Sequence, residues 1–251
     1  MAEMFYNVRR TGLLTMMVIV VVTSAFAQNL DAVQKLRKQL ADANDEQTFQ
    51  ILCSIGFEYR YSFPDSTLIY CNRAFDLGTK IDMNTDLAKP LSFIGLAYAN
   101  KGDYSNSIEN HRKAIDVAIA QNDSLELAHG YNNLGRMFYD QGDLVRAFDN
   151  LIRSKEIFEE LGDKSGLAYV YRSMANVYAL QHDFEKALDM SKSAYRLRVE
   201  VGETRMIVSS LMELGLINQS AKNPEKALTY FLKADSASAN INDPVTRAEL
   251  S

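Results

Sequence analysis

Apolar positions between residues 128 and 163 form two helical faces separated by a short break. The first helix carries apolar or small side chains at i, i+3, i+4 and i+7, which are Tyr131, Leu134, Gly135 and Phe138. The second repeats this kind of face with Leu144, Ala147, Phe148 and Leu151. Gly142-Asp143 between them suits a tight turn. The segment therefore predicts an antiparallel helix hairpin, which cannot bury both of its faces without further copies.

Such copies recur at intervals of 40 residues. The apolar anchor of the first helix recurs as Ile94, Leu134, Met174 and Leu214. In the second helix the large residue recurs as Leu68, Ile108, Phe148, Leu188 and Leu228. The small residue before it recurs as Thr67, Ser107, Ala147, Ala187 and Ala227. Five copies in phase predict an all-α solenoid of stacked hairpins over residues 48–241, with an ordinary helical bundle as the alternative.

The order of large and small residues in each copy resembles that of the tetratricopeptide repeat family. The usual period of that family is 34 residues, and the period of 40 resembles its longer-helix branch, found in kinesin light chain and Rap-type bacterial regulators. The resemblance covers residues 48–241. It implies a right-handed superhelix, a concave groove lined by the first helix of each repeat, and a non-catalytic scaffold that binds an extended peptide or a partner helix there.

Polar residues at the groove positions gather in the third and fourth repeats. In the third repeat they are His129, Asn132, Asn133, Arg136 and Tyr139, and in the fourth Arg172, Ser173 and Asn176. Asparagine can both donate to and accept from a peptide backbone, and arginine can bind carboxylates through two parallel hydrogen bonds. We expect these residues to bind a protein or peptide segment, with a solvated helix face as the alternative.

The first 27 residues have the pattern of an export signal. Arg9 and Arg10 precede a largely apolar run over residues 13–22, and Ala25-Phe26-Ala27 is a small-x-small cleavage site. This predicts a mature chain that begins at Gln28 and an exported bacterial protein, periplasmic or secreted. An uncleaved membrane anchor is the alternative.

Both ends of the array have expected roles. Residues 28–47 are expected to hold a helix that covers the first repeat with Val33, Leu36 and Leu40, followed by a linker. Residues 242–251 open with Asn242-Asp243-Pro244, which fits the start of an incomplete sixth repeat. The chain would then be a fragment of a longer protein, or its end would be completed by a partner. A second functional hypothesis follows, in which the repeats are the sensor region of a membrane-bound signalling protein, a histidine kinase or transcription regulator.

The net charge and the N-terminal segment bear on two classes of partner, nucleic acids and membranes. The formal net charge of −5 argues against non-specific nucleic-acid binding, which needs a cationic surface. A membrane partner is expected only if the signal segment is uncleaved or the chain is part of a membrane protein.

Candidate chemical residues are few, and most of them fit the repeat. The three histidines, His111, His129 and His182, lie in different repeats without metal-ligand spacing, and no catalytic motif is present. We therefore expect no enzyme activity, metal or cofactor. His111 occupies a packing position and is expected to be a hydrogen-bonded core histidine, whereas His182 replaces a turn glycine and is expected to be exposed. Cys53 and Cys71 are expected to lie on facing helices of the first hairpin. There they would either form a disulfide or be two small buried apolar residues.

Overall fold

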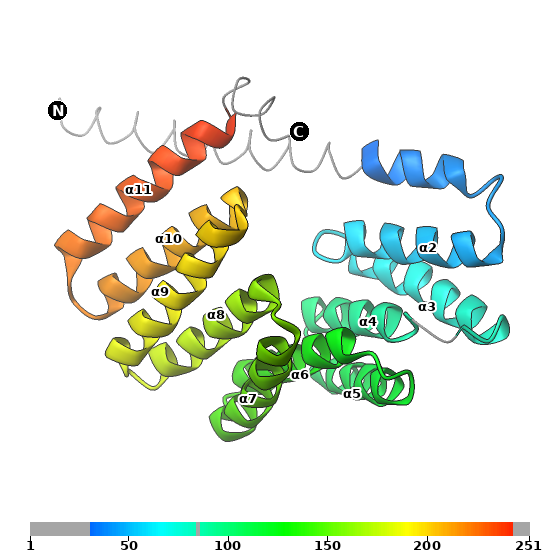
Figure 1. Cartoon of the computed structure of the whole chain (residues 1–251), viewed down its shortest axis with the longest axis horizontal. Helices are drawn as coiled ribbons and strands as arrows, with labels where there is room; N and C mark the ends of the chain where they lie inside the picture. The colour runs from blue at the N-terminus through cyan, green and yellow to red at the C-terminus, as the bar shows by residue number, and fades with distance from the viewer. Residues whose placement is uncertain (1–30, 84–85, 243–251) are drawn as a thin grey trace. The chain divides into compact units, whose positions relative to one another are not determined.

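A computed structural model describes residues 31–83 and 86–242 of the chain, and every regular element in these ranges is a helix (Figure 1). Residues 31–39 are helical. The following helices are α2 (Asp45–Tyr59), α3 (Pro64–Lys80), α4 (Ala88–Asn100), α5 (Tyr104–Ala120), α6 (Ser124–Asp140), α7 (Leu144–Leu161), α8 (Lys164–Leu180), α9 (Phe184–Val201), α10 (Thr204–Ser220) and α11 (Pro224–Asn242). The all-α solenoid is thereby confirmed. The signal segment and residues 243–251 of the proposed sixth repeat lie outside the described residues.

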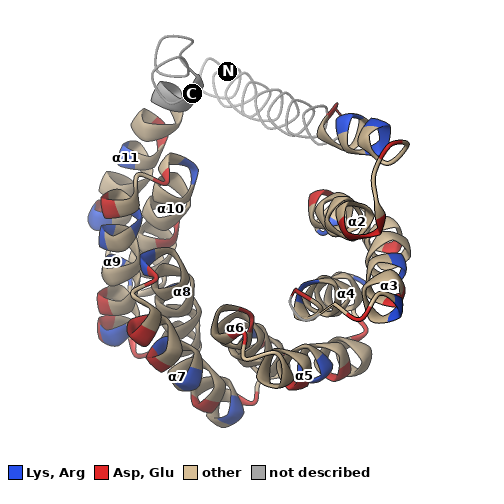
Figure 2. Cartoon of the chain, turned by 45° about the vertical axis from the view of Figure 1, so that its right-hand side comes forward, with Lys and Arg blue, Asp and Glu red and all other residues tan. Residues whose placement is uncertain are grey.

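The helices fall into two compact units. In the first unit, which ends at Asp103, α3 packs against both α2 and α4. In the second unit, which begins at Tyr104, each helix from α5 to α11 packs against the next, and α6 also contacts α8. Within this second unit α6, α8 and α10 lie along one side and α5, α7, α9 and α11 along the other (Figure 2). We call these two sides the A layer and the B layer.

Aspartate side chains begin four helices of the second unit. Asp123 and Asp163 cap α6 and α8, and Asp143 and Asp183 cap α7 and α9, each accepting from the backbone N–H three residues on. The residue two places before Asp143 and Asp183 is the C-cap of the preceding helix. The residue between them has a positive φ, 78° at Gly142 and 61° at His182. His182 is exposed, as predicted. A short turn of this kind returns the chain antiparallel and produces the hairpin.

The core of the second unit shows why small residues recur in register. A Cβ atom added to Gly135 would lie 2.8 Å from two side-chain atoms of Leu151, because α6 and α7 approach closely there. Phe158 and Leu151 on α7 are completely buried, and they pack in one cluster with residues of α5, α6 and α8. Large side chains of one helix thus fill the space that small residues of the next leave open.

The helix α2 begins with polar residues that precede its apolar pattern. We expected the array to start at residue 48, but α2 starts at Asp45 and is capped by Asn44. The Asn44 side chain accepts from the Gln47 N–H at 2.8 Å, and the Gln47 side chain accepts from the Asn44 N–H at 3.1 Å. This reciprocal pair satisfies two helix-end donors with polar residues, which a search for apolar periodicity overlooks. At the other end α11 continues to Asn242, one residue beyond the expected limit.

The segment before α2 packs against the first repeat. Val33 is 1% exposed and packs in one cluster with Ile55 and Tyr59. Among the described residues no helix is both long enough and apolar enough to cross a bilayer.

No disulfide joins Cys53 and Cys71 in this structure, and both side chains are buried. Burial, with a smaller contribution from the neighbouring Cys53, raises the pKa of the Cys71 thiol far above its usual range. The pair corresponds to the second of the two interpretations, small apolar side chains within a core.

Candidate functional site

The predicted groove residues all lie on α6 and α8 of the A layer, but two of them have a different role from the one expected. Asn132 and Ser173 are each only 6% exposed. Ser173 Oγ lies 3.0 Å from Asn132 Oδ1 and 3.1 Å from the Tyr169 carbonyl oxygen. The prediction that these two side chains line a groove is therefore wrong, because their hydrogen bond joins α6 to α8 inside the unit.

Four other predicted residues form a half-buried polar surface with unused hydrogen-bonding capacity, which we call the A-layer face. They are Asn133, Arg136, Arg172 and Asn176. None of the four side chains makes a hydrogen bond or salt bridge with another residue in the described ranges. Two helical asparagines outside the A layer behave differently: Asn72 on α3 and Asn110 on α5 donate to the carbonyl oxygen four residues earlier, at 2.7 and 2.8 Å. The amides of the A-layer face are therefore available to an external group.

The two remaining predicted residues, His129 and Tyr139, flank this face. The His129 ring packs edge-on against Phe158 with 5.1 Å between ring centroids, so its position is set by the core. Tyr139 is half-buried, and this burial, followed by the negative charge of Asp140, raises the pKa of its hydroxyl. Both side chains therefore lie at the edges of the A-layer face and contribute little hydrogen-bonding capacity to it.

A buried charge near this face was not predicted from the sequence. Arg198 on α9 is completely buried. Its guanidinium donates to Ser210 Oγ and to the Met206 carbonyl oxygen, while its Nε and Nη2 have no hydrogen-bond partner in the described structure. The guanidinium carbon lies 5.6 Å from the centroid of the Tyr169 ring. A cation at this depth has lost its water and has regained only part of its hydrogen bonding.

Glu213 on α10 is the acidic partner of this region. Burial raises the pKa of its carboxyl to about 7, and the positive charges of Arg172 and Arg198 oppose that rise. Its Oε1 is buried without a hydrogen-bond partner among the described residues. The repeat register could have indicated both groups, because Arg198 occupies the place of Phe158, and Glu213 that of Ser173, 40 residues earlier.

His111 on α5 is buried as expected, but it is not hydrogen-bonded as expected. Its side chain has no exposed surface, and neither ring nitrogen has a partner within the described part of the chain. Burial, followed by the positive charge of Arg136, lowers its pKa to about 3. The imidazole is therefore neutral at physiological pH and acts as a packing residue.

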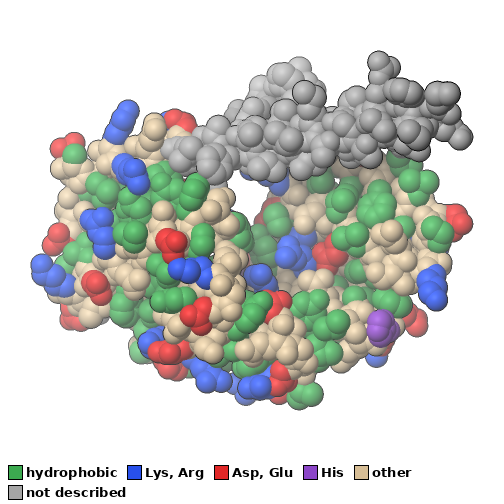
Figure 3. Space-filling view, turned by 180° about the vertical axis from the view of Figure 1, so that it is seen from behind, with side chains coloured by type: hydrophobic (Ala, Val, Ile, Leu, Met, Phe, Trp, Pro, Cys, Tyr) green, Lys and Arg blue, Asp and Glu red, His purple; other side chains and the backbone are tan. Residues whose placement is uncertain are grey.

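No group of three metal-ligating side chains that could hold an ion occurs in the described ranges. On the surface that Figure 3 shows, acidic and basic side chains are interspersed with hydrophobic ones. A continuous cationic stripe of the kind that nucleic-acid backbones require is not visible on that surface. The chemistry offered by the A-layer face is thus hydrogen bonding and charge pairing.

Comparisons with known proteins agree with the repeat architecture. A tetratricopeptide repeat model matches residues 86–151 and 126–200, and a second tetratricopeptide repeat model matches residues 208–241. A search of curated proteins found no match.

Several solved structures share the fold. BtubC (BKLC) from P. vanneervenii has a TM-score of 0.64 and 17% identity, with 86% of this chain and 90% of that chain covered. The apo form of RapI has a TM-score of 0.59 and 14% identity, covering 84% and 90%. A Rap protein complexed with competence and sporulation factor has a TM-score of 0.63 and 14% identity, covering 84% and 69%.

At these identities the likeness of the solved structures concerns the fold. The repeat models, however, cover more than half of the sequence, and the matched residues correspond to the helices from α4 to α11 and the turns between them. The chain belongs to the tetratricopeptide repeat family.

Proposed function

We propose that this protein is a non-catalytic scaffold that binds an extended peptide, or an extended segment of a partner protein, across α6 and α8. The observation that carries the proposal is the unused hydrogen-bonding capacity of the A-layer face. A peptide backbone presents alternating donors and acceptors, and the amides of Asn133 and Asn176 can satisfy both kinds. Because these side chains are half-buried, they lose less conformational freedom on binding than fully exposed ones would.

The charges beside the asparagines favour a segment with a carboxylate. Arg136 and Arg172 form no salt bridge with described residues, and a guanidinium can fork onto a carboxylate with two parallel hydrogen bonds. The Rap protein complex supports the proposal to the extent that a related fold holds a bound factor.

Selection from a displayed library of random peptides, followed by calorimetric titration of the enriched peptides, tests this function. We expect the double substitution Asn133→Ala/Asn176→Ala to weaken binding by about tenfold or more, since each lost hydrogen bond costs about 0.5–1.5 kcal/mol. The matched control is Asn72→Ala/Asn110→Ala, which removes two asparagines that bond to their own helices. Equal affinity of the two double variants for every enriched peptide would refute binding at this face.

We also propose that the protein is exported. The support is the pattern of the first 27 residues: a basic pair, an apolar run and a small-x-small site. We expect the protein from a bacterial extracytoplasmic fraction to begin at Gln28 when its N-terminus is determined by mass spectrometry. An intact Met1 terminus with the protein confined to the cytoplasm would contradict this proposal.

A further inference from the structure

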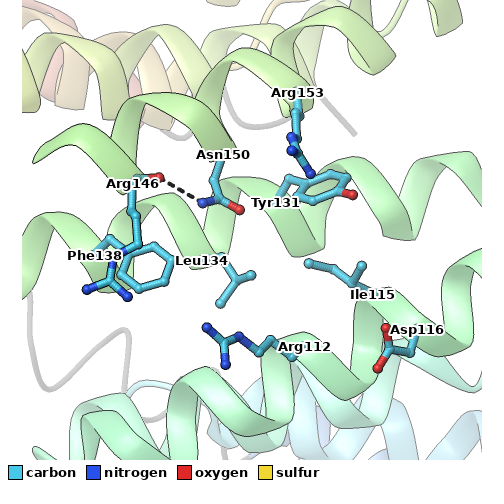
Figure 4. A pocket seen from close by; sticks show the side chains of 9 residues that line it. All are labelled: Arg112, Ile115, Asp116, Tyr131, Leu134, Phe138, Arg146, Asn150 and Arg153. Carbon is cyan, nitrogen blue, oxygen red and sulfur yellow. Dashed lines mark hydrogen bonds between the residues drawn. The ribbon is translucent and has the colours of Figure 1, made fainter. Parts of the chain in front are cut away.

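A cleft of about 350 Å³ opens on the B layer of the second unit, away from the A-layer face. Residues of α5 and α7 form its two walls, and α6 forms its floor with Leu134 and the rings of Tyr131 and Phe138 (Figure 4). The volume is enough for two or three side chains of a bound segment, with the rest of that segment lying outside. The cleft therefore suits a short anchor and is too small for a globular ligand.

Three arginines line this cleft in a chain whose net charge is negative. Arg112 comes from α5, opposite Arg146 and Arg153, which come from α7 (Figure 4). Asp116 is the one acidic residue of the lining. Neither Arg112 nor Arg153 forms a salt bridge with a residue that the structure describes. Arg146 pairs with Asp143, with 2.6 Å between Nε and Oδ2, and Asp143 lies outside the lining.

Aromatic rings orient two of the three guanidinium groups. The Arg146 guanidinium carbon is 4.4 Å from the Phe138 ring centroid, and that of Arg153 is 5.6 Å from the Tyr131 centroid. A guanidinium stacked on a ring keeps its N–H edges free for a carboxylate and is already partly ordered before binding. Two of the cations are thus held at the floor of the cleft, while Arg112 faces them from the other wall.

The repeat does not require these arginines. One repeat later, Ile152 and Ser193 occupy the places of Arg112 and Arg153, while the floor residue Tyr131 is matched by Tyr171. Apolar floor positions therefore serve packing, whereas the guanidinium groups are an addition to it. Two repeats later the same two places hold Lys192 and Lys233, and Lys192 lies 3.7 Å from Asp189.

We propose that this B-layer cleft binds an acidic segment of a partner protein, through aspartate or glutamate side chains placed between Arg112 and the pair Arg146 and Arg153. Charge complementarity identifies the occupant: two unpaired guanidinium groups face each other across a small cleft with an apolar floor. Bidentate arginine–carboxylate pairs are among the stronger polar contacts in proteins, and lysine lacks their fork geometry. The lining of the cleft shares no residue with the A-layer face, although α6 contributes side chains to both.

Fluorescence anisotropy with a labelled decapeptide of alternating Glu and Ala residues tests the cleft. We expect saturable binding that is at least about tenfold weaker for the peptide with Gln in place of Glu, and weaker again as salt rises. Arg112→Ala/Arg153→Ala should reduce the affinity for the Glu peptide by at least about tenfold. Both arginines are exposed, so circular dichroism should show an unchanged fold.

Two double variants serve as controls that remove the same charge. Lys192→Ala/Lys233→Ala alters the two positions that correspond to Arg112 and Arg153 two repeats later. Arg136→Ala/Arg172→Ala alters the A-layer face. Both should bind the Glu peptide within about threefold of the wild type. The proposal would be overturned if the lysine variant lost as much affinity as the cleft variant, or if only the A-layer variant lost binding. It would also be overturned by equal affinity for the Glu and Gln peptides, or by no binding of the Glu peptide at millimolar concentration.

Discussion

Phe158→Ala should lower the free energy of unfolding by about 3–5 kcal/mol, the largest effect expected of a single substitution here. The Phe158 ring is completely buried in the core cluster of the second unit. It fits so closely beneath α8 that a Cβ atom on Gly166 would lie 2.3 Å from two of its ring atoms. Such a close-packed neighbourhood cannot collapse into the vacated volume, so a cavity adds to the lost apolar burial. Urea unfolding followed by circular dichroism measures the loss.

Two control variants on α7 separate packing from helix propensity. Phe158→Leu keeps most of the volume and should cost less than about 1.5 kcal/mol. Leu161→Ala removes a side chain that is 46% exposed and should change stability by no more than about 0.5 kcal/mol. If Phe158→Ala cost no more than Leu161→Ala, the described packing of α7 against α8 would be wrong.

His111→Leu should remove a loss of stability that the wild type shows in acid. The folded-state pKa of His111 is lowered to about 3 from an ordinary 6.5, chiefly by burial. Below pH 6.5 the unfolded chain therefore binds a proton that the folded chain cannot accept until about pH 3, so stability falls as pH falls through this window. Between pH 7.5 and pH 4.5 this amounts to about 2–3 kcal/mol.

The wild type must be compared with His111→Leu, because Glu213 changes the free energy of unfolding with pH in the opposite direction to His111. Its folded-state pKa of about 7 lies above the ordinary 4.5, so its unfavourable contribution grows as pH rises from 4.5 to 7. Leucine is a suitable replacement because Leu151 occupies the same repeat position one repeat later. Urea unfolding of both proteins from pH 7.5 to 4.5 should give curves that diverge in acid, and parallel curves would refute the assignment of a neutral, buried His111.

The sequence was sufficient for the repeat architecture because the fold repeats one local solution. The recurring Gly142-Asp143 type of turn and the small residue opposite Leu151 are visible in the sequence as spacing. The start of α2 is not visible in the apolar spacing, because the capping box of Asn44 and Gln47 consists of polar residues that lie before the first buried side chain.

The candidate site could be predicted less well from the sequence. Consecutive residues on a helix point in directions about 100° apart, so one of two neighbouring polar side chains can be buried while the other is accessible. Asn132 turns toward α8 and pairs with Ser173, whereas the adjacent Asn133 keeps its amide unpaired. Register alone does not separate two such neighbours without the packing of the next helix. Arg198 could have been found, because a charged residue at the place of Phe158 breaks the pattern. The B-layer cleft could not, because three helices bring its residues together.

Amide hydrogen exchange of the wild type, with and without an enriched peptide at saturation, tests the proposed binding face most directly. Binding should slow exchange in α6 and α8, the helices that carry the A-layer face, and leave α3 unchanged, since a ligand stabilises the segments whose folded form it contacts. Slowed exchange in α3 or in the helices of the B layer, with α6 and α8 unaffected, would contradict the account.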